Sequence, residues 1–436
     1  MKFPRPARAA GALAMAALVL SASPLAAQEP SYTPEQIAEF QEKGAKLQEF
    51  LNNQDTYLPT VNLIDAAQLP VTFPYTEIQD HVVVDVAFGD DAALPFMFDT
   101  GAGTLISREI QEANPSELIV ESIGVAGGGA IIITPTRRYP SLTVADSVTV
   151  TEVLASDPWE GGDVFACITP NGLLGASSMQ KAVWQVDYGT KQISVADSVD
   201  QLEHIDGAIA LPYIIPEGNK LSPTPHVVLP VGNGEIEFIV DTGGGLPMAI
   251  EPAQLAAVGV ELPADAPTFG TLAAGAAGAF EGTAQYARLP IMFGDTELSV
   301  PVAVAAGVGT IAGGNIGHMF LKNFVATFDF PNQMLYLEPL FEGTTVPDLA
   351  DPPAAGFALQ NGQVLVTSVP KGGPADEQGA KVGDVITHVD GQSVEGITAD
   401  EYCARFATTT THETVTTASG ATYDASPIEG FWASMD

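Results

Sequence analysis

The stretch Pro95-Phe96-Met97-Phe98-Asp99-Thr100-Gly101-Ala102-Gly103 returns 142 residues later as Glu237-Phe238-Ile239-Val240-Asp241-Thr242-Gly243-Gly244-Gly245. In each copy an apolar run, which is typical of a buried strand, ends in Asp-Thr-Gly. The same offset relates Gly172-Leu173-Leu174-Gly175 to Gly314-Asn315-Ile316-Gly317. It also relates residues 184–188 to residues 326–330. Three matching segments in one order indicate an internal duplication, so we expect two homologous lobes over residues 71–200 and 201–342.

The repeated Asp-Thr-Gly sequence predicts a particular local geometry. An apolar strand buries the backbone, and the glycine permits a sharp turn that presents the carboxylate. The hydroxyls of Thr100 and Thr242 can hydrogen-bond the loop that faces them. Each copy is followed about 75 residues later by a Gly-x-x-Gly segment. This pattern predicts that Asp99 and Asp241 act as a pair.

These motifs resemble the catalytic loops of aspartic proteases, in particular bacterial members related to the retroviral and pepsin-like enzymes. The resemblance implies a mainly β, bilobal, β-barrel-like fold with pseudo-twofold symmetry. It implies that Asp99 and Asp241 form the catalytic dyad. Supporting roles in the catalytic loops fall to Thr100, Gly101, Thr242 and Gly243. The family has an apolar-apolar-Gly segment beneath each loop; residues 173–175 fit it fully, whereas Asn315 replaces the first apolar residue of the second copy.

The resemblance also implies the chemistry. In that family two carboxyl groups that share one proton activate a water for attack on a peptide carbonyl. This hydrolysis requires no metal and no cofactor. The residue after each Asp-Thr-Gly is Ala102 or Gly244, where many acid-active relatives have a hydroxyl donor. We therefore expect activity nearer neutral pH than in stomach-type relatives.

A glycine-rich stretch lies between the first aspartate and its Gly-x-x-Gly segment, at residues 124–133. In the family this region is the flap, a hairpin that closes over substrate, and Gly127, Gly128 and Gly129 would form its tip. Residues 270–282 are the counterpart in the second lobe. A plain mobile loop is an equally open interpretation.

The N-terminus has the pattern of an exported protein. Residues 1–27 combine basic residues, an apolar run of twelve and a small-residue exit, which predicts a signal peptide and a periplasmic or secreted protein. Residues 28–70 are expected to be helical, since Thr33 and Gln36 form a capping-box pattern. This segment is a propeptide or lid over a cleft, or a docking helix that covers core surface; we favour the docking helix.

The C-terminal part has a different pattern. Residues 343–355 contain three prolines and are expected to form a linker. Residues 356–436 resemble a bacterial PDZ domain, on the phrases Gly373-Pro374-Ala375, Gly379-x-x-x-Gly383-Asp384 and Asp390-Gly391. The resemblance implies that Gly356, Phe357, Ala358 and Leu359 capture the C-terminal carboxylate of a peptide ligand. A docking module that binds no peptide is the alternative.

The composition limits the classes of partner that this protein is expected to bind. The chain has 436 residues and a formal net charge of −37, which argues against nucleic acid or an anionic membrane as a partner. No segment after the signal peptide is apolar enough to span a membrane. Cys167 and Cys403 fall in different predicted domains, so we expect two separate thiols rather than a bridge.

The sequence thus leaves three hypotheses. The first is an exported aspartic endopeptidase that cleaves peptides or proteins and, with both half-sites in one chain, is active as a monomer. The second is an inactive peptide-binding or scaffold protein. The third is a zymogen that requires trimming at the N-terminus.

Overall fold

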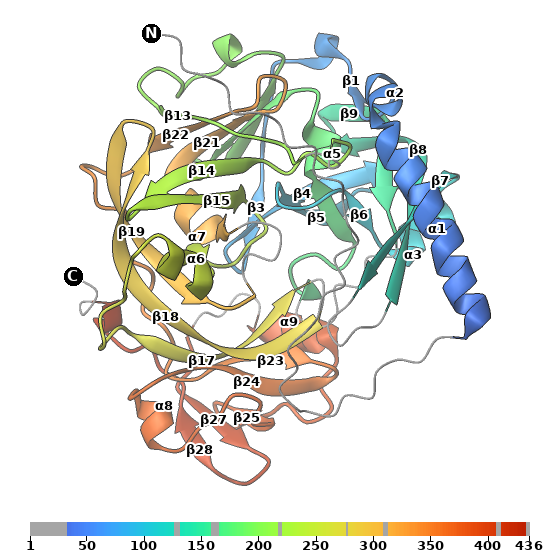
Figure 1. Cartoon of the computed structure of the whole chain (residues 1–436). Helices are drawn as coiled ribbons and strands as arrows, with labels where there is room; N and C mark the ends of the chain where they lie inside the picture. Colours follow the sequence, from blue (N-terminus) through green and yellow to red (C-terminus); the bar gives the residue numbers. More distant parts are fainter. Residues whose placement is uncertain are drawn as a thin grey trace.

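The computed structural model describes residues 33–125, 131–157, 165–216, 220–275, 278–307, 313–406 and 411–432. The predicted signal peptide, residues 1–27, lies outside this range. The fold is mainly β, as predicted, and Figure 1 shows two sheet-rich lobes with a smaller C-terminal unit beneath them. Among the described residues, no helix is both long enough and apolar enough to cross a membrane.

The first large sheet comes from the N-terminal half of the chain. Its strand order is β1-β9-β6-β10-β5-β4-β8-β7, with β3 paired to β4. In chain order the strands are β1 (Leu63–Ile64), β3 (Thr76–Ile78), β4 (His81–Phe88), β5 (Leu94–Asp99), β6 (Leu105–Ile106), β7 (Glu117–Val125), β8 (Ile131–Val144), β9 (Val148–Ser156) and β10 (Gly172–Gly175).

The second large sheet repeats this arrangement and then continues into the C-terminal unit. Its order is β14-β15-β20-β16-β19-β18-β17-β24-β23. The strands are β14 (His226–Val231), β15 (Gly234–Val240), β16 (Met248–Ile250), β17 (Thr268–Gly275), β18 (Gly278–Phe293), β19 (Thr296–Ala305), β20 (Gly314–Ile316), β23 (Gly356–Gln360) and β24 (Gln363–Pro370).

A six-stranded sheet joins the two halves and carries the pseudo-twofold axis. Its order is β13-β22-β21-β11-β12-β2. At the centre β11 and β21 pair antiparallel, and Gln185 faces Thr327, its own counterpart 142 residues later. The Gln185 Nε2 donates a 2.8 Å hydrogen bond to Thr327 Oγ1. The strands are β2 (Val71–Pro74), β11 (Val183–Asp187), β12 (Gln192–Ala196), β13 (Ile209–Pro212), β21 (Phe324–Asp329) and β22 (Met334–Pro339).

The core follows the same division. One continuous apolar cluster runs through both lobes and includes Phe98, Trp184 and Phe328. This continuity means that the lobes fold against each other as one body. A separate cluster fills the C-terminal unit. That unit also holds a four-stranded sheet of order β26-β25-β27-β28, formed by β25 (Ile386–Val389), β26 (Gln392–Ser393), β27 (Thr414–Thr417) and β28 (Thr422–Asp424).

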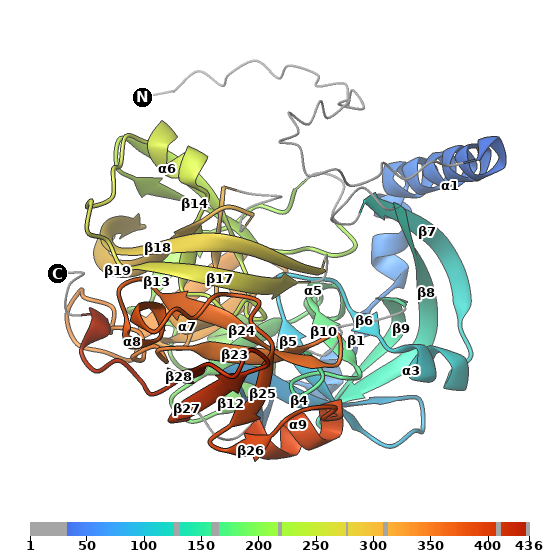
Figure 2. The same ribbon diagram turned by 90° about the horizontal axis from the view of Figure 1, so that it is seen from below.

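Helices are short except at the N-terminus. The longest, α1 (Pro34–Asn52), begins with the predicted capping box: Thr33 and Gln36 each accept a hydrogen bond from the other's backbone N–H. It lies along β7, the edge strand of the first sheet (Figures 1 and 2). The other α-helices are α2 (Gln54–Tyr57), α3 (Arg108–Ala113), α5 (Ala176–Met179), α6 (Pro252–Ala257), α7 (His318–Leu321), α8 (Pro374–Glu377) and α9 (Ala399–Phe406). Short 3-10 turns occupy Leu58–Thr60, Ala66–Gln68 and Val199–Gln201.

The C-terminal unit is bound to both lobes rather than tethered loosely. Strand β24 pairs with β17 of the second lobe, with Gly270 opposite Val369. Cys167 of the first lobe and Cys403 of α9 form a disulfide with a Cα–Cα distance of 5.0 Å. The expectation of two separate thiols was therefore wrong, because docking of the C-terminal unit brings positions 236 residues apart into contact.

The segment predicted as a linker packs against the second lobe along part of its length. Val346 is fully buried, and its backbone N–H donates to the Ser299 carbonyl of the second lobe. Arg288 pairs with Asp348 and also donates to the Val346 carbonyl. Residues 343–355 therefore connect two units but are held against the second lobe along part of their length.

Candidate active site

Two strands end at the Asp-Thr-Gly loops, and each is supported in the same way. β5 runs parallel to β10, with Leu174 opposite Phe98 and Gly175 opposite Asp99. β15 runs parallel to β20, with Ile316 opposite Val240. Each Gly-x-x-Gly segment therefore lies beside the strand that carries the aspartate and fixes the point at which the loop begins.

The two threonines join the loops across the pseudo-twofold axis. The Thr100 backbone N–H donates to Thr242 Oγ1 at 3.0 Å, and the Thr242 N–H donates to Thr100 Oγ1 at 3.1 Å. The Thr100 hydroxyl donates to the Val240 carbonyl at 2.7 Å, and the Thr242 hydroxyl to the Phe98 carbonyl at 2.8 Å. Both threonines are fully buried. Four reciprocal hydrogen bonds without access to water hold the two loops in one relative position.

The glycines of the motif allow each loop to approach the opposite carboxyl. A Cβ on Gly101 would overlap the Asp241 carboxyl group, and a Cβ on Gly243 would lie 2.6 Å from the Asp99 Cγ. Since real Cβ atoms do not come so close, only glycine fits at either position. The two aspartates that the sequence separates by 142 residues are therefore brought together at one point.

The carboxyl groups of Asp99 and Asp241 hydrogen-bond each other. Asp99 is 6% exposed. Burial raises the pKa of Asp99 well above its usual range, and the charge and hydrogen bond of Asp241 raise it further. The backbone N–H groups of Gly101 and Ala102 act in the opposite direction. Two carboxyl groups that interact this closely titrate as a unit.

Among the described residues, Asp241 has one side-chain donor for which Asp99 has no counterpart. Gly243 N–H donates to Asp241 Oδ1 at 3.0 Å, as Gly101 N–H does to Asp99 Oδ1 at 2.8 Å. In addition, Asn315 Nδ2 donates to Asp241 Oδ2 at 2.7 Å. The sequence marked Asn315 as a departure from the apolar pattern but assigned it no role.

The two flap candidates are strands of long hairpins. β7 pairs with β8 as far as Val125 opposite Ile131. Gly127, Gly128 and Gly129 lie outside the described residues. In the second lobe β17 pairs with β18 up to Gly275 opposite Gly278. The described parts of both regions are thus paired strands, so a hairpin is favoured over a plain loop.

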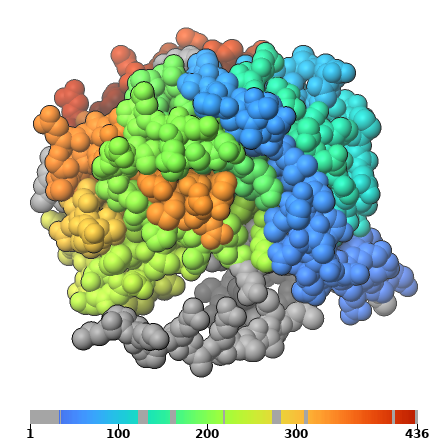
Figure 3. Space-filling model, turned by 90° about the horizontal axis from the view of Figure 1, so that it is seen from above, coloured from blue at the N-terminus to red at the C-terminus, as the bar shows by residue number. Residues whose placement is uncertain are grey.

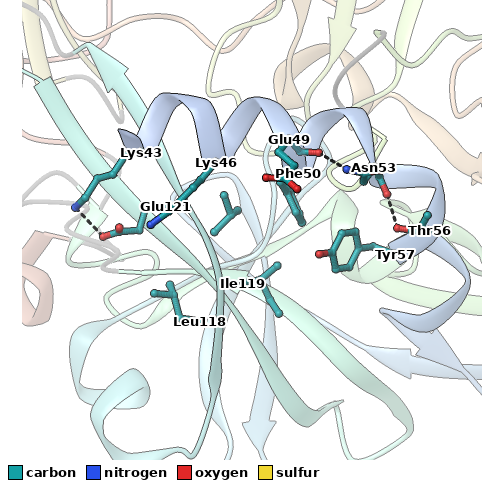
Figure 4. Close-up of a pocket in the computed structure, with 11 residues that line it drawn as sticks. Lys43, Lys46, Glu49, Phe50, Asn53, Thr56, Tyr57, Leu118, Ile119 and Glu121 are labelled. Atoms are coloured by element: carbon teal, nitrogen blue, oxygen red, sulfur yellow. Dashed lines mark hydrogen bonds and ion pairs between the residues drawn. The ribbon is translucent and has the colours of Figure 1, made fainter. Parts of the chain in front are cut away.

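The N-terminal segment packs against the first of these hairpins. Figure 4 shows a pocket between α1, α2 and β7, with Phe50 and Tyr57 directed toward Ile119. The volume of this pocket is about 490 Å³. Lys43 pairs with Glu121 of β7 at 3.0 Å. Figure 3 shows the N-terminal helices on the outer surface of the molecule. This placement is that of a docking helix on the edge of the first sheet.

The predicted peptide-binding residues of the C-terminal unit, Gly356, Phe357, Ala358 and Leu359, belong to β23. This is the last strand of its sheet among the described residues, so its outer edge is where a peptide strand would add. The Tyr402 hydroxyl of α9 lies 3.5 Å from the Phe357 carbonyl oxygen, and the Leu359 N–H donates toward the same hydroxyl. Tyr402 therefore engages the backbone groups that an added strand would need.

Sequence reasoning missed several of these features. Asn315 had a signal, since a polar residue stands where its counterpart Leu173 is apolar. Tyr402 had none, because its role depends on how α9 packs against β23. The pairing of β17 with β24 had none either, since strand pairing between distant segments leaves no local pattern.

Comparison with known proteins adds two findings. The PDZ domain family matches residues 365–417. Among solved structures, Basic 7S globulin from soybean is similar to this chain, with a TM-score of 0.38 and 10% identity over 62% of this chain and 94% of that one. A search of curated proteins found no match. The C-terminal part of the chain thus contains a PDZ domain.

Proposed function

We propose that this protein is an exported aspartic endopeptidase in which Asp99 and Asp241 activate a water between them. The observation that supports this most directly is the contact between two carboxyl groups from homologous loops, in a site where the threonines and glycines admit little movement. Such a pair is costly to retain without a use for it, because it places two ionisable groups in a buried setting.

The reaction follows from the shared proton. The ionised carboxylate takes a proton from a water, whose oxygen bonds to the carbonyl carbon of the peptide. The protonated carboxyl gives its proton to the carbonyl oxygen. When the C–N bond breaks, the nitrogen takes a proton from the first carboxyl, and a hydroxyl of the intermediate returns one to the second. The dyad ends in its starting state.

The substrates proposed are peptides or proteins, and one chain supplies the whole site. The proposed export fits the disulfide between Cys167 and Cys403, since disulfides persist in oxidising compartments such as the periplasm and the extracellular space. The PDZ domain is proposed to recruit or regulate rather than to take part in the reaction.

The test is a cleavage assay on residues 28–436 with a diverse peptide pool between about pH 3 and 8, read by mass spectrometry. Asp99→Asn is expected to abolish cleavage and to keep the fold. Asp329→Asn is the matched control: Asp329 is also buried, but its carboxylate accepts from Asn332 in a turn away from the dyad.

Cleavage by the parent and by the control variant, but not by Asp99→Asn, would support the proposal. Equal cleavage by all three would contradict the dyad mechanism. If none of the folded proteins cleaves, the assay is repeated without residues 28–70. Activity then would indicate a zymogen, and its absence a binding or scaffold protein.

A further inference from the structure

Asn315, which breaks the apolar-apolar-Gly pattern, reaches the dyad directly. Its Nδ2 donates a 2.7 Å hydrogen bond to Asp241 Oδ2. Its backbone is fixed on both sides, because it lies opposite Ile239 on β15 and opposite Ala249 on β16. The amide is therefore presented to the carboxylate from the middle of a sheet and not from a loop.

Gly244 leaves the space that the amide occupies. A Cβ on Gly244 would lie 2.9 Å from Asp241 Oδ2 and 3.1 Å from Asn315 Oδ1. The first distance is shorter than real Cβ contacts, and the second is tighter than most of them. A hydroxyl side chain after Asp-Thr-Gly and an amide at position 315 thus compete for the same place beside the carboxylate. This chain has the glycine and the amide.

The arrangement is not repeated in the first lobe. The counterpart of Asn315 is Leu173, which is buried in an apolar cluster with Val83 and Met97. Among the described residues, the donors to Asp99 other than Asp241 are the backbone N–H groups of its own loop. Two homologous carboxyl groups therefore differ by one strong donor.

The chemistry of that donor fixes which form it stabilises. An amide N–H₂ group can only donate, and a hydrogen bond donated to a carboxylate favours the charged form. We propose that Asn315 is a positioning residue that keeps Asp241 ionised, so that Asp241 is the base and Asp99 the acid of the dyad. The roles of base and acid rest on the proposed function, whereas the location of the charge does not.

The proposal agrees with the surroundings of Asp99 and corrects one expectation. Burial, followed by the Asp241 charge, raises the pKa of Asp99, and this direction agrees with Asp99 as the protonated member of the pair. Ala102 and Gly244 led to the expectation that the hydroxyl donor of acid-active relatives is lost at both carboxyls. At Asp241 the amide of Asn315 on β20 supplies a donor in its place.

The test compares Asn315→Leu, which restores the apolar pattern, with Asn323→Leu as the matched control. Asn323 also lies in the second lobe, but its amide donates to the carbonyls of Met319 and Phe320. The first readout is the pH profile of kcat/KM. Asn315→Leu is expected to move the acid limb up by about one pH unit and to leave the basic limb in place. The basic limb stays because Asp241 is charged on both sides of that step.

The second readout does not require cleavage. Carbon-13 labelled aspartate reports the titration of the dyad by NMR, with signals assigned from Asp241→Asn. The lower of the two midpoints is expected to rise by about one pH unit in Asn315→Leu and to stay in Asn323→Leu. If no variant cleaves but this shift is seen, the proposed function fails and the inference stands.

An evenly reduced kcat/KM with an unmoved acid limb, or an unmoved lower midpoint, would show that Asn315 only supports the fold, and the proposal would be wrong. If Asn315→Leu does not fold, Asn315→Ala removes the same donor with a smaller side chain. The same shift is expected of it.

Discussion

Replacing His318 with leucine is expected to make the protein markedly less sensitive to acid. His318 begins α7, directly after the Gly-x-x-Gly segment of the second lobe, and is 1% exposed. Within the described part of the chain neither of its ring nitrogens has a hydrogen-bond partner. The ring stacks on His81 at 5.9 Å and meets Tyr188 edge-on at 5.3 Å. A charge in this setting would be poorly solvated.

The size of the effect follows from the pKa of His318, which is lowered to about 3. Burial is the main cause, and the nearby charges of His81 and Lys322 lower it further, whereas Glu77 opposes them. In the unfolded chain the ordinary value is 6.5. The unfolded state therefore binds a proton that the folded state refuses, and stability is lost as the pH falls below 6.5. This loss reaches about 2 kcal/mol at pH 5 and about 3 kcal/mol at pH 4.

The assay is urea unfolding of the parent and of His318→Leu at pH 7.5 and at pH 5. Between these two conditions the variant is expected to lose about 2 kcal/mol less than the parent. His204→Gln controls for the loss of a histidine elsewhere, since His204 is half-exposed and bonded to Glu338. Parallel losses in the parent and in His318→Leu would refute the reasoning.

Three further outcomes test other parts of the structure. Gly101→Ala should reduce kcat/KM by about a hundredfold, because the added Cβ displaces the Asp241 carboxyl. Gly44→Ala should leave kcat/KM unchanged, because a Cβ there meets open space. Both variants are assayed with a peptide that the parent cleaves. Cys403→Ser should lower the free energy of unfolding, measured by urea titration, by about 3 to 5 kcal/mol. Added reductant should lower the free energy of unfolding of the parent to the same value. Tyr402→Phe should raise the affinity of β23 for fluorescent C-terminal peptides by about tenfold, because it frees edge backbone groups; unchanged anisotropy would contradict this.

The two-lobe arrangement could be predicted from the sequence because it depends on local sequence patterns. An apolar strand, a turn that only glycine permits and a second strand at a fixed offset each leave a mark within a few residues. Two copies of these patterns predict a pseudo-twofold arrangement even when no contact between the copies is known. The bilobal β fold was predicted on this basis and confirmed, and the structure places Asp99 beside Asp241. Their catalytic roles stay predictions.

The features that sequence reasoning missed depend on contacts between distant segments. The disulfide was judged from domain membership, and the judgement failed because Cys167 packs against the core of the PDZ domain. The pairing of β24 with β17 depends on how the C-terminal unit docks against the second lobe. No local sequence pattern predicts that docking. Asn315 could be seen as a departure, but its function required the distance to Asp241.

These features have one consequence in common: each makes one lobe differ from the other and so breaks the pseudo-twofold symmetry. The second hairpin, β17 and β18, is bound along its outer edge by β24, and Phe269 of β17 stacks on Trp432 near the C-terminus. The first hairpin carries α1 instead. At the dyad, Asp241 alone has a side-chain amide donor among the residues that the structure describes. A peptide has a direction, and a symmetric site would accept it equally well in two orientations. Under the proposed function, the differences between the two hairpins and between the two carboxyls would favour one orientation of the peptide and give each aspartate one role. Two copies in one chain can differ in this way, because each copy has its own sequence.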